Sequence, residues 1–284
     1  MRSGNEDTVD KGIYMGQARG WYLYGIVQQV PSDGDVAASP LRHSSEDIQF
    51  LQHAGVAAVV RSVQLADFAP EAIHARLHDM RWLEMMATHH HQVIESIHSV
   101  RPMLPVTFGC VYPDEAGLRA ALADVRETLL TRLKWVADCD EWTVRLYGNT
   151  TCLERRLIQQ DARLQHLQDE IKRVAPGRAY LLRHKLVGEL AKAMEQTLAT
   201  WTENEFARLS QTARASLIQP EATDTGRSGR QGEKELLRAV FLVPRVDLAT
   251  FHQEVERIAA RNEGMRGECS GPWPPYSFAA LEED

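Results

Sequence analysis

The chain has 284 residues, a length that favours two domains over one or three. Hydrophobic residues make up 44% of it and charged residues 25%, which is the balance of a folded globular protein. The formal net charge of −7 argues against a nucleic-acid-binding protein and against attachment to an anionic membrane surface. No window approaches the ~18 consecutive apolar residues that a membrane span requires.

The N-terminal residues and the cysteines indicate the cellular compartment. Residues 1–19 carry acidic side chains where a secretory signal needs an uninterrupted apolar segment, and they lack any hydrophobic period. The four cysteines are widely separated and form no C-x-x-C pair, which fits a reduced compartment. We therefore expect a cytoplasmic protein with a disordered leader at 1–19.

Residues 20–112 have the pattern of an N-terminal α+β domain. The apolar run at 56–60 is hydrophobic on both faces and predicts a central buried strand. Gly55 is expected to end the short helix that we predict directly before it, at 44–54. The expected elements, in chain order, are a strand at 21–27, a short capped helix at 44–54, the strand at 56–60, two helical pieces over 71–99 and a strand at 103–108.

A connecting helix is predicted at 113–138, and a C-terminal α+β domain at 139–284. Leucines at helical spacing predict two long helices over 151–210, which the Pro176-Gly177 turn should fold into an antiparallel hairpin. A polar, glycine-containing segment at 221–235 is expected to be a mobile loop. The other expected elements are strands at 141–147, 213–219, 236–243 and 265–270 and a helix at 246–262.

The order of strands and helices is similar in the two halves. This order fits an α+β fold of two domains, each with an antiparallel, ferredoxin-like sheet packed by helices. The second domain would carry the long helical hairpin in addition.

A cluster of histidines is the feature most suggestive of chemistry. His74 and His78 are one helical turn apart, and His89, His90, His91 and His98 follow. The first pair could place two imidazoles on one helix face, as zinc sites do, but no third ligand is specified. We interpret the cluster as solvated and partly hydrogen-bonded helix histidines and predict no metal site. The alternative is a metal- or haem-dependent enzyme on a ferredoxin-like scaffold.

Other catalytic signatures are missing from the sequence. It contains neither a G-x-S-x-G elbow nor a glycine-rich phosphate-binding loop. The acidic group of Asp138, Asp140 and Glu141 lies at a helix-to-strand junction, where acidic side chains commonly cap or solvate a turn. We therefore predict no catalytic residue and no cofactor.

The C-terminal segment 271–278 combines three prolines with Trp273, Tyr276 and Phe278. Prolines remove backbone donors and favour an extended path, so these three rings should not be ordinary ladder residues. The rings either lock the tail across the protein's own surface or contribute to a groove for a partner. We favour the first interpretation because most large aromatic side chains serve their own core.

Seven segments together resemble the gas vesicle protein F/L family. The most specific are P-V-T-F-G at 105–109 and G-P-W-P-P-Y-S-F at 271–278. The resemblance covers residues 21 to 278. The matching segments are Tyr22–Val27, Trp82–Glu84 followed by His90, Leu104–Gly109, Glu141–Leu146, Pro176–Leu181, Phe241–Val243 and Gly271–Phe278.

The resemblance implies a two-domain α+β protein without enzymatic activity that helps to build gas vesicles. Its expected partners are the major, small hydrophobic shell subunit and other gas vesicle accessory proteins, in the cytoplasm at the vesicle. The apolar pattern suggests that the shell subunit binds by strand addition at 236–243, where Leu237, Phe241 and Val243 share one face. The resemblance leaves open whether the chain is an F or an L member, and whether it nucleates, chaperones or becomes part of the wall.

Overall fold

A computed structural model describes residues 18–29, 48–76, 78–220 and 233–280. The chain forms two units: Met1–Cys139 together with Trp273–Asp284, and Asp140–Pro272. The predicted leader and the predicted loop at 221–235 lie almost entirely outside the described residues. In the described part of the chain, no helix is long and apolar enough to span a bilayer.

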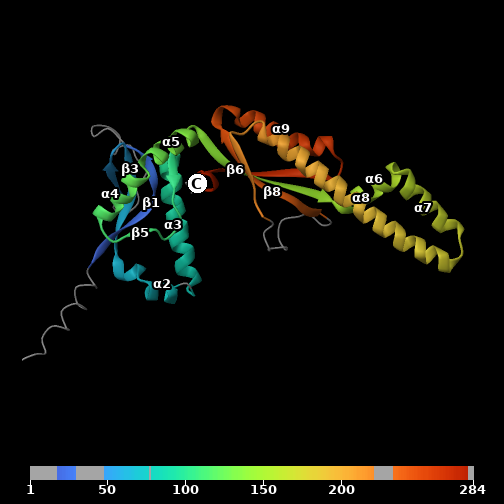
Figure 1. Cartoon of the computed structure of the whole chain (residues 1–284), viewed down its shortest axis with the longest axis horizontal. Coiled ribbons are helices and arrows are strands. Elements are labelled where there is room, and N and C mark those ends of the chain that lie inside the picture. Colours follow the sequence, from blue (N-terminus) through green and yellow to red (C-terminus); the bar gives the residue numbers. More distant parts are fainter. Residues whose placement is uncertain (1–17, 30–47, 77, 221–232, 281–284) are drawn as a thin grey trace, which may run out of the picture. The chain divides into compact units, whose positions relative to one another are not determined.

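The first unit is built on a five-stranded sheet of order β2-β3-β1-β4, with β5 also paired to β1 (Figure 1). The pairs of β1 with β3, β4 and β5, and of β2 with β3, are antiparallel. Its strands are β1 (Arg19–Gln28), β2 (Ile48–His53), β3 (Val56–Gln64), β4 (Met103–Pro105) and β5 (Val111–Tyr112). Its helices are η3 (Leu65–Phe68), α2 (Pro70–Arg76), α3 (Met80–His98), α4 (Glu115–Asp124) and α5 (Arg126–Val136).

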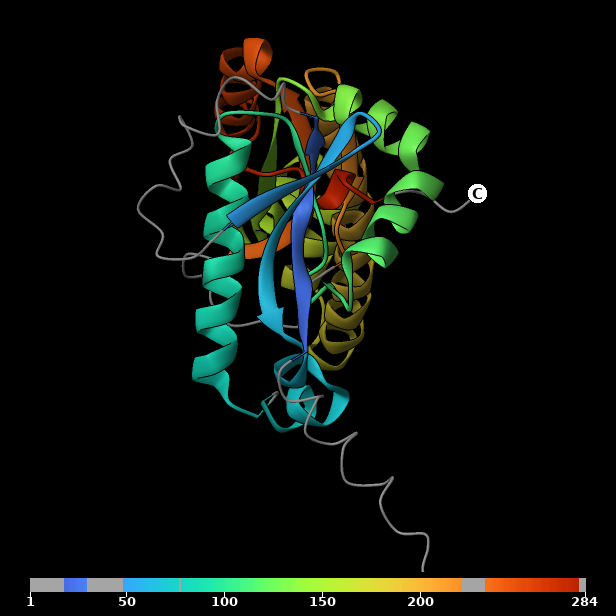
Figure 2. The same cartoon turned by 90° about the vertical axis from the view of Figure 1, so that its left-hand side faces the viewer.

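Strand β3 confirms the central buried strand expected from its apolar run. All five residues from Val56 to Val60 are buried, and β3 lies between β2 and β1. Figure 2 shows the reason: α3 covers one face of this sheet while α4 and α5 cover the other. A strand with helices on both sides has no solvated face, so it carries no polar alternation.

The helix expected at 44–54 is wrong where the structure describes it, because residues 48–53 form β2. Ala54 and Gly55 both have positive φ angles, 48° and 95°, and they link β2 to β3 as a two-residue hairpin loop. Positive φ at both central residues is the mark of a type I′ turn, which matches the twist of antiparallel strands. Gly55 therefore turns a hairpin and does not end a helix.

The prediction of a single connecting helix at 113–138 is also wrong. Two helices, α4 and α5, replace it and meet at Val125, which is their shared cap residue. The apolar stripe that predicted one long helix is buried on the first sheet, through Leu118 and Leu122 of α4 and Leu129 and Leu133 of α5. The segment is therefore part of the first unit.

The second unit has a four-stranded sheet of order β7-β8-β6-β9. Its core joins Trp142, Phe241 and Phe251 to Trp201 and Leu209 of the long helix α8. The strands are β6 (Cys139–Asn149), β7 (Ala215–Ile218), β8 (Glu233–Pro244) and β9 (Met265–Trp273). The helices are α6 (Thr150–Gln160), α7 (Ala162–Arg173), α8 (Pro176–Ser210), η4 (Arg245–Asp247) and α9 (Leu248–Arg261).

A helical extension formed by α6, α7 and the N-terminal half of α8 projects from the second sheet (Figure 1). It corresponds to the expected hairpin, with two differences. Asp161 breaks the first arm by capping α7 through the Arg163 amide. Pro176 occupies the first turn of α8, where its missing amide hydrogen costs nothing, and so it begins the second arm. With 35 residues, α8 is about 52 Å long.

The chain leaves the second unit beside the place where it enters. A Cβ atom on Gly271, near the end of β9, would lie 2.8 Å from the Trp142 ring and 3.0 Å from the Glu141 carbonyl oxygen in β6. The residues after this crossing, Trp273 onward, belong to the first unit and include the short helix η5 (Tyr276–Phe278). The domain expected at 139–284 therefore ends at Pro272, and the second unit is an insertion in the first.

We expect Gly25→Ala to destabilise the protein by about 1–3 kcal/mol, because the added Cβ would overpack the contact between β1 and β4. That Cβ would lie 2.5 Å from the Leu104 carbonyl oxygen. Gly188→Ala is the matched control. It lies within α8 with nothing near its Cβ position, and it should stabilise the helix by about 0.5–1 kcal/mol. Urea unfolding measures both, and equal effects of the two variants would contradict the packing account.

Candidate partner-binding site

The residues of β8 that the sequence suggested for partner binding are not accessible to a partner. Phe241 and Val243 are 0% and 1% exposed and belong to the core of the second unit, and Leu237 packs against the same core. Strand β8 lies between β7 and β6, and β7 pairs with it over Ala239–Leu242. The prediction that this strand is a free edge is therefore wrong, because an apolar face also suits a central strand.

The C-terminal aromatic residues are held against helices of the first unit. Phe278 is buried and lies with its ring centre 6.1 Å from that of Trp135 in α5. The Tyr276 hydroxyl is hydrogen-bonded to His91 Nδ1 of α3 at 2.7 Å, and the Trp273 ring lies 5.8 Å from the His91 ring. The tail thus packs on the protein's own surface, which agrees with the interpretation favoured from the sequence.

Packing leaves part of the tail accessible. Trp273 and Tyr276 are each 37% exposed. We name these two residues together with His91 the aromatic tail surface. Trp273 is the last residue of β9, so the expectation that it is not a strand residue is wrong. Pro272 is tolerated in this strand because β9 lies at the edge of its sheet.

The side of α3 that carries His91 also carries two exposed apolar residues, with the exposed Glu84 between them. Met80, Ala87 and His91 follow the i, i+7, i+11 spacing that places residues on one side of a helix. Met80 is 71% exposed, and Ala87 is also exposed. Methionine is a flexible side chain that adapts to varied apolar partners. Sequence reasoning missed Met80, although its helical spacing from His91 could have indicated it.

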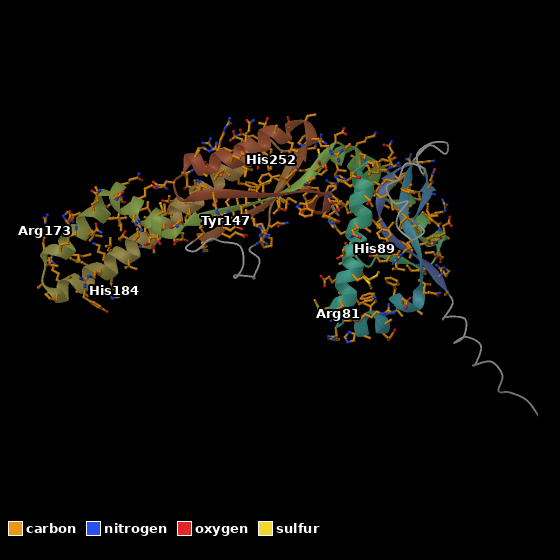
Figure 3. The ribbon with its side chains drawn as sticks, turned by 180° about the vertical axis from the view of Figure 1, so that it is seen from behind. Arg81, His89, Tyr147, Arg173, His184 and His252 are labelled. Atoms are coloured by element: carbon orange, nitrogen blue, oxygen red, sulfur yellow. The ribbon has the colours of Figure 1, made fainter. Side chains whose placement is uncertain are left out.

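The histidine run on α3 is mainly a hydrogen-bonding partner of β1. His90 is buried, and its Nδ1 lies 2.9 Å from the Tyr22 hydroxyl, which also accepts a hydrogen bond from the Gly109 amide. The Tyr24 hydroxyl lies 3.1 Å from His89 Nε2. Figure 3 shows His89 on α3, beside the strands of the first unit. The hydrogen bonds agree with the expectation that the histidines are partly hydrogen-bonded, but the expectation that they are solvated is wrong for His90.

Burial determines the charge state of this pair. It lowers the pKa of His90 to about 4 and raises that of the Tyr22 hydroxyl. Both side chains are therefore neutral at neutral pH, and they serve to satisfy each other's polar atoms inside an apolar core.

The enzyme alternative depends on the pair His74 and His78, and among the described residues this pair has no third metal ligand. The His74 and His78 rings are 5.9 Å apart and edge to face, and both residues are exposed. Over the residues that the structure describes, no group of three or more His, Cys, Asp or Glu side chains could hold a metal ion.

Two antiparallel sheets packed by helices define an α+β protein, and its C-terminal tail carries partly exposed aromatic rings. The sequence model of the family "Gas vesicle synthesis protein GvpL/GvpF" matches residues 20–280. The chain belongs to this gas vesicle protein family. The family and the fold expected from the resemblance are confirmed.

Individual relatives agree with this assignment. The chain is 29% identical to gas vesicle protein L of Streptomyces sp. (strain CB03234), over 93% of this chain and 94% of that protein. It is 27% identical to gas vesicle protein F of the same strain, over 90% and 98%. The crystal structure of GvpF from Anabaena sp. PCC7120 has the same fold, with a TM-score of 0.66 at 17% identity over 93% of this chain and 99% of that one.

The lowered pKa of His90 predicts a pH dependence of stability. Because the folded value lies below the usual 6.5, the neutral ring stabilises the fold fully above about pH 6.5, and this contribution is lost as the pH falls toward about 4. In an NMR titration the His90 ring should titrate near pH 4. A His90→Gln variant should lose less stability than the parent between about pH 7 and about pH 4.5. A His90 ring that titrates near pH 6.5 would contradict the burial account.

Proposed function

We propose that this chain is a gas vesicle accessory protein that binds the small hydrophobic shell subunit during vesicle formation, as an assembly factor or minor structural component. It would act in the cytoplasm, associated with the gas vesicle and with other accessory proteins, and by contact without catalysis. Family membership supports the gas vesicle role. The aromatic tail surface supports the binding role.

The physical need for such a protein follows from the shell itself. A shell that excludes liquid water requires a subunit with a continuous apolar face, and this face promotes aggregation before assembly. The present chain is a poor shell subunit, since a quarter of its residues are charged. A partner that covers the apolar face until assembly would keep the subunit in a usable state.

The observation that carries the proposal is that the two tail rings are fixed in position and still exposed. Trp273 and Tyr276 are held by His91 yet remain more than one third exposed. Fixed aromatic side chains lose little conformational entropy on binding and are the commonest energetic centres of protein interfaces. Ala87, one turn before His91 on α3, adds apolar contact area beside the rings, and Met80 lies farther along the same side, beyond Glu84.

Substitution of both rings tests the proposal. In cells that produce the shell subunit with this chain carrying an affinity tag, Trp273→Ala/Tyr276→Ala should lower recovery of the shell subunit by about tenfold or more, because each buried aromatic centre contributes about 2 kcal/mol. Val246→Ala is the matched control, since Val246 is 87% exposed on the second unit and should not change recovery.

The folding of each variant is checked by its thermal unfolding midpoint, since Tyr276 also contacts α3. A second variant, Tyr276→Phe, keeps the ring and removes only the hydroxyl bonded to His91. It should retain most of the recovery if ring contact matters. Unchanged recovery with the folded double variant would overturn this site, and loss of recovery with Val246→Ala would show that the effect is unspecific.

A further inference from the structure

Helix α8 carries one row of side chains that is buried at its C-terminal end and exposed at its N-terminal end. The row follows alternating steps of three and four residues, which place its members on one side of the helix. Trp201 belongs to the core of the second unit, and Met194 and Leu198 pack against that core. The row continues with the same spacing into the helical extension, where it is exposed. We name this exposed part the α8 row; it consists of Tyr180, His184, Val187 and Ala191.

The α8 row lies on the side of α8 that α7 does not cover. Figure 3 shows His184 on the side of α8 that faces away from α7. Tyr180 and Val187 are 60% and 66% exposed, and Leu181, next to Tyr180, is 68% exposed. The Tyr180 ring packs edge to face on the His184 ring, with ring centres 4.6 Å apart. Exposed apolar side chains grouped in this way mark an interaction surface.

The spacing and the sizes of these side chains decide which partner fits. A row with alternating steps of three and four residues packs on another helix, because its side chains enter the spaces between those of the partner. Side-chain size decreases along the α8 row, from tyrosine through histidine and valine to alanine. A helix that packs closely on it must therefore present its small side chains first and its large ones last. The α8 row of a second copy, running antiparallel, has this order.

We propose that the α8 rows of two copies of this chain pack against each other in antiparallel orientation. A two-fold axis relates the copies, so each contact occurs twice. Tyr180 of each copy would lie against Ala191 of the other, and His184 against Val187. The four residues of the row then form four layers, each with one larger and one smaller side chain. The contact differs from the aromatic tail surface, so the inference does not depend on binding of the shell subunit.

Two features beside the α8 row favour this register. Leu181 would lie near Gly188 of the second copy, and nothing in the chain comes within 4 Å of a Cβ atom placed on Gly188. Pro176, the first residue of α8, would lie opposite Glu195 of the second copy, next to Met194, where the row enters the core. The pairing therefore uses the exposed part of α8 and ends where the second unit covers the helix.

Sedimentation equilibrium of the full-length protein tests for this dimer. A contact made by one helix of each copy is small, and interfaces that bury less than about 1,200 Å² form weak, transient complexes. Between about 1 μM and about 500 μM, the protein should therefore show a reversible equilibrium between monomer and dimer. Val246→Ala, at a position that is 87% exposed outside the extension, should not change the dissociation constant.

Exchange of the two end residues of the α8 row tests the antiparallel orientation. Ala191→Tyr places two tyrosines in one layer, and Tyr180→Ala leaves that layer underfilled. Each single variant should therefore weaken dimerisation by about tenfold or more. The double variant Tyr180→Ala/Ala191→Tyr again has one tyrosine and one alanine in each of these layers. Its dissociation constant should return to within about threefold of the parent value, because the two changes compensate only between antiparallel copies.

Thermal unfolding midpoints confirm that each variant is folded, and several outcomes would overturn the inference. These are a monomer over the whole concentration range, dimerisation that Ala191→Tyr leaves unchanged, and failure of the double variant to recover. Dimerisation lost in Trp273→Ala/Tyr276→Ala but kept in Ala191→Tyr would assign self-association to the aromatic tail surface. Capture of the shell subunit should be unchanged in Ala191→Tyr, so failure of this inference and failure of the proposed function are distinguishable.

Discussion

The return of the C-terminal tail to the first unit is the constraint on which the rest of the structure depends. Burial of Phe278 against Trp135 and the hydrogen bond from Tyr276 to His91 fix the tail on α5 and α3. The first unit is therefore made from two separate segments of sequence, with the second unit inserted between them. The same contacts that anchor the tail leave two aromatic rings accessible at fixed positions.

The two units carry different kinds of surface. The first unit presents the aromatic tail surface with exposed Met80, an apolar surface suited to a hydrophobic subunit. The second unit presents a helical extension whose long helix α8 exposes charged and apolar side chains.

Patterns that depend on local physics could be read from the sequence, while pairing between distant segments could not. The two-sided apolar run of β3 and the leucine period of α8 predicted their elements. Residues 48–53 form a strand because they pair with β3 through the turn at Ala54 and Gly55, and this pairing was not visible in the local sequence pattern. The apolar face of β8 fits an edge strand and a central strand equally well. The sequence pattern therefore could not show that Phe241 and Val243 are core residues and not partner-binding ones. The tail was identified by its composition, but its contact with His91, 185 residues away, required the fold.

Site-specific photo-crosslinking during gas vesicle formation tests the central claim most directly. A benzophenone side chain placed at Trp273 should form a covalent adduct with the small shell subunit in cells that are assembling vesicles. The same group at Val246, which is more exposed but lies on the second unit, should not form this adduct. If position 246 forms adducts with the shell subunit and position 273 forms none, the account of the aromatic tail surface is contradicted.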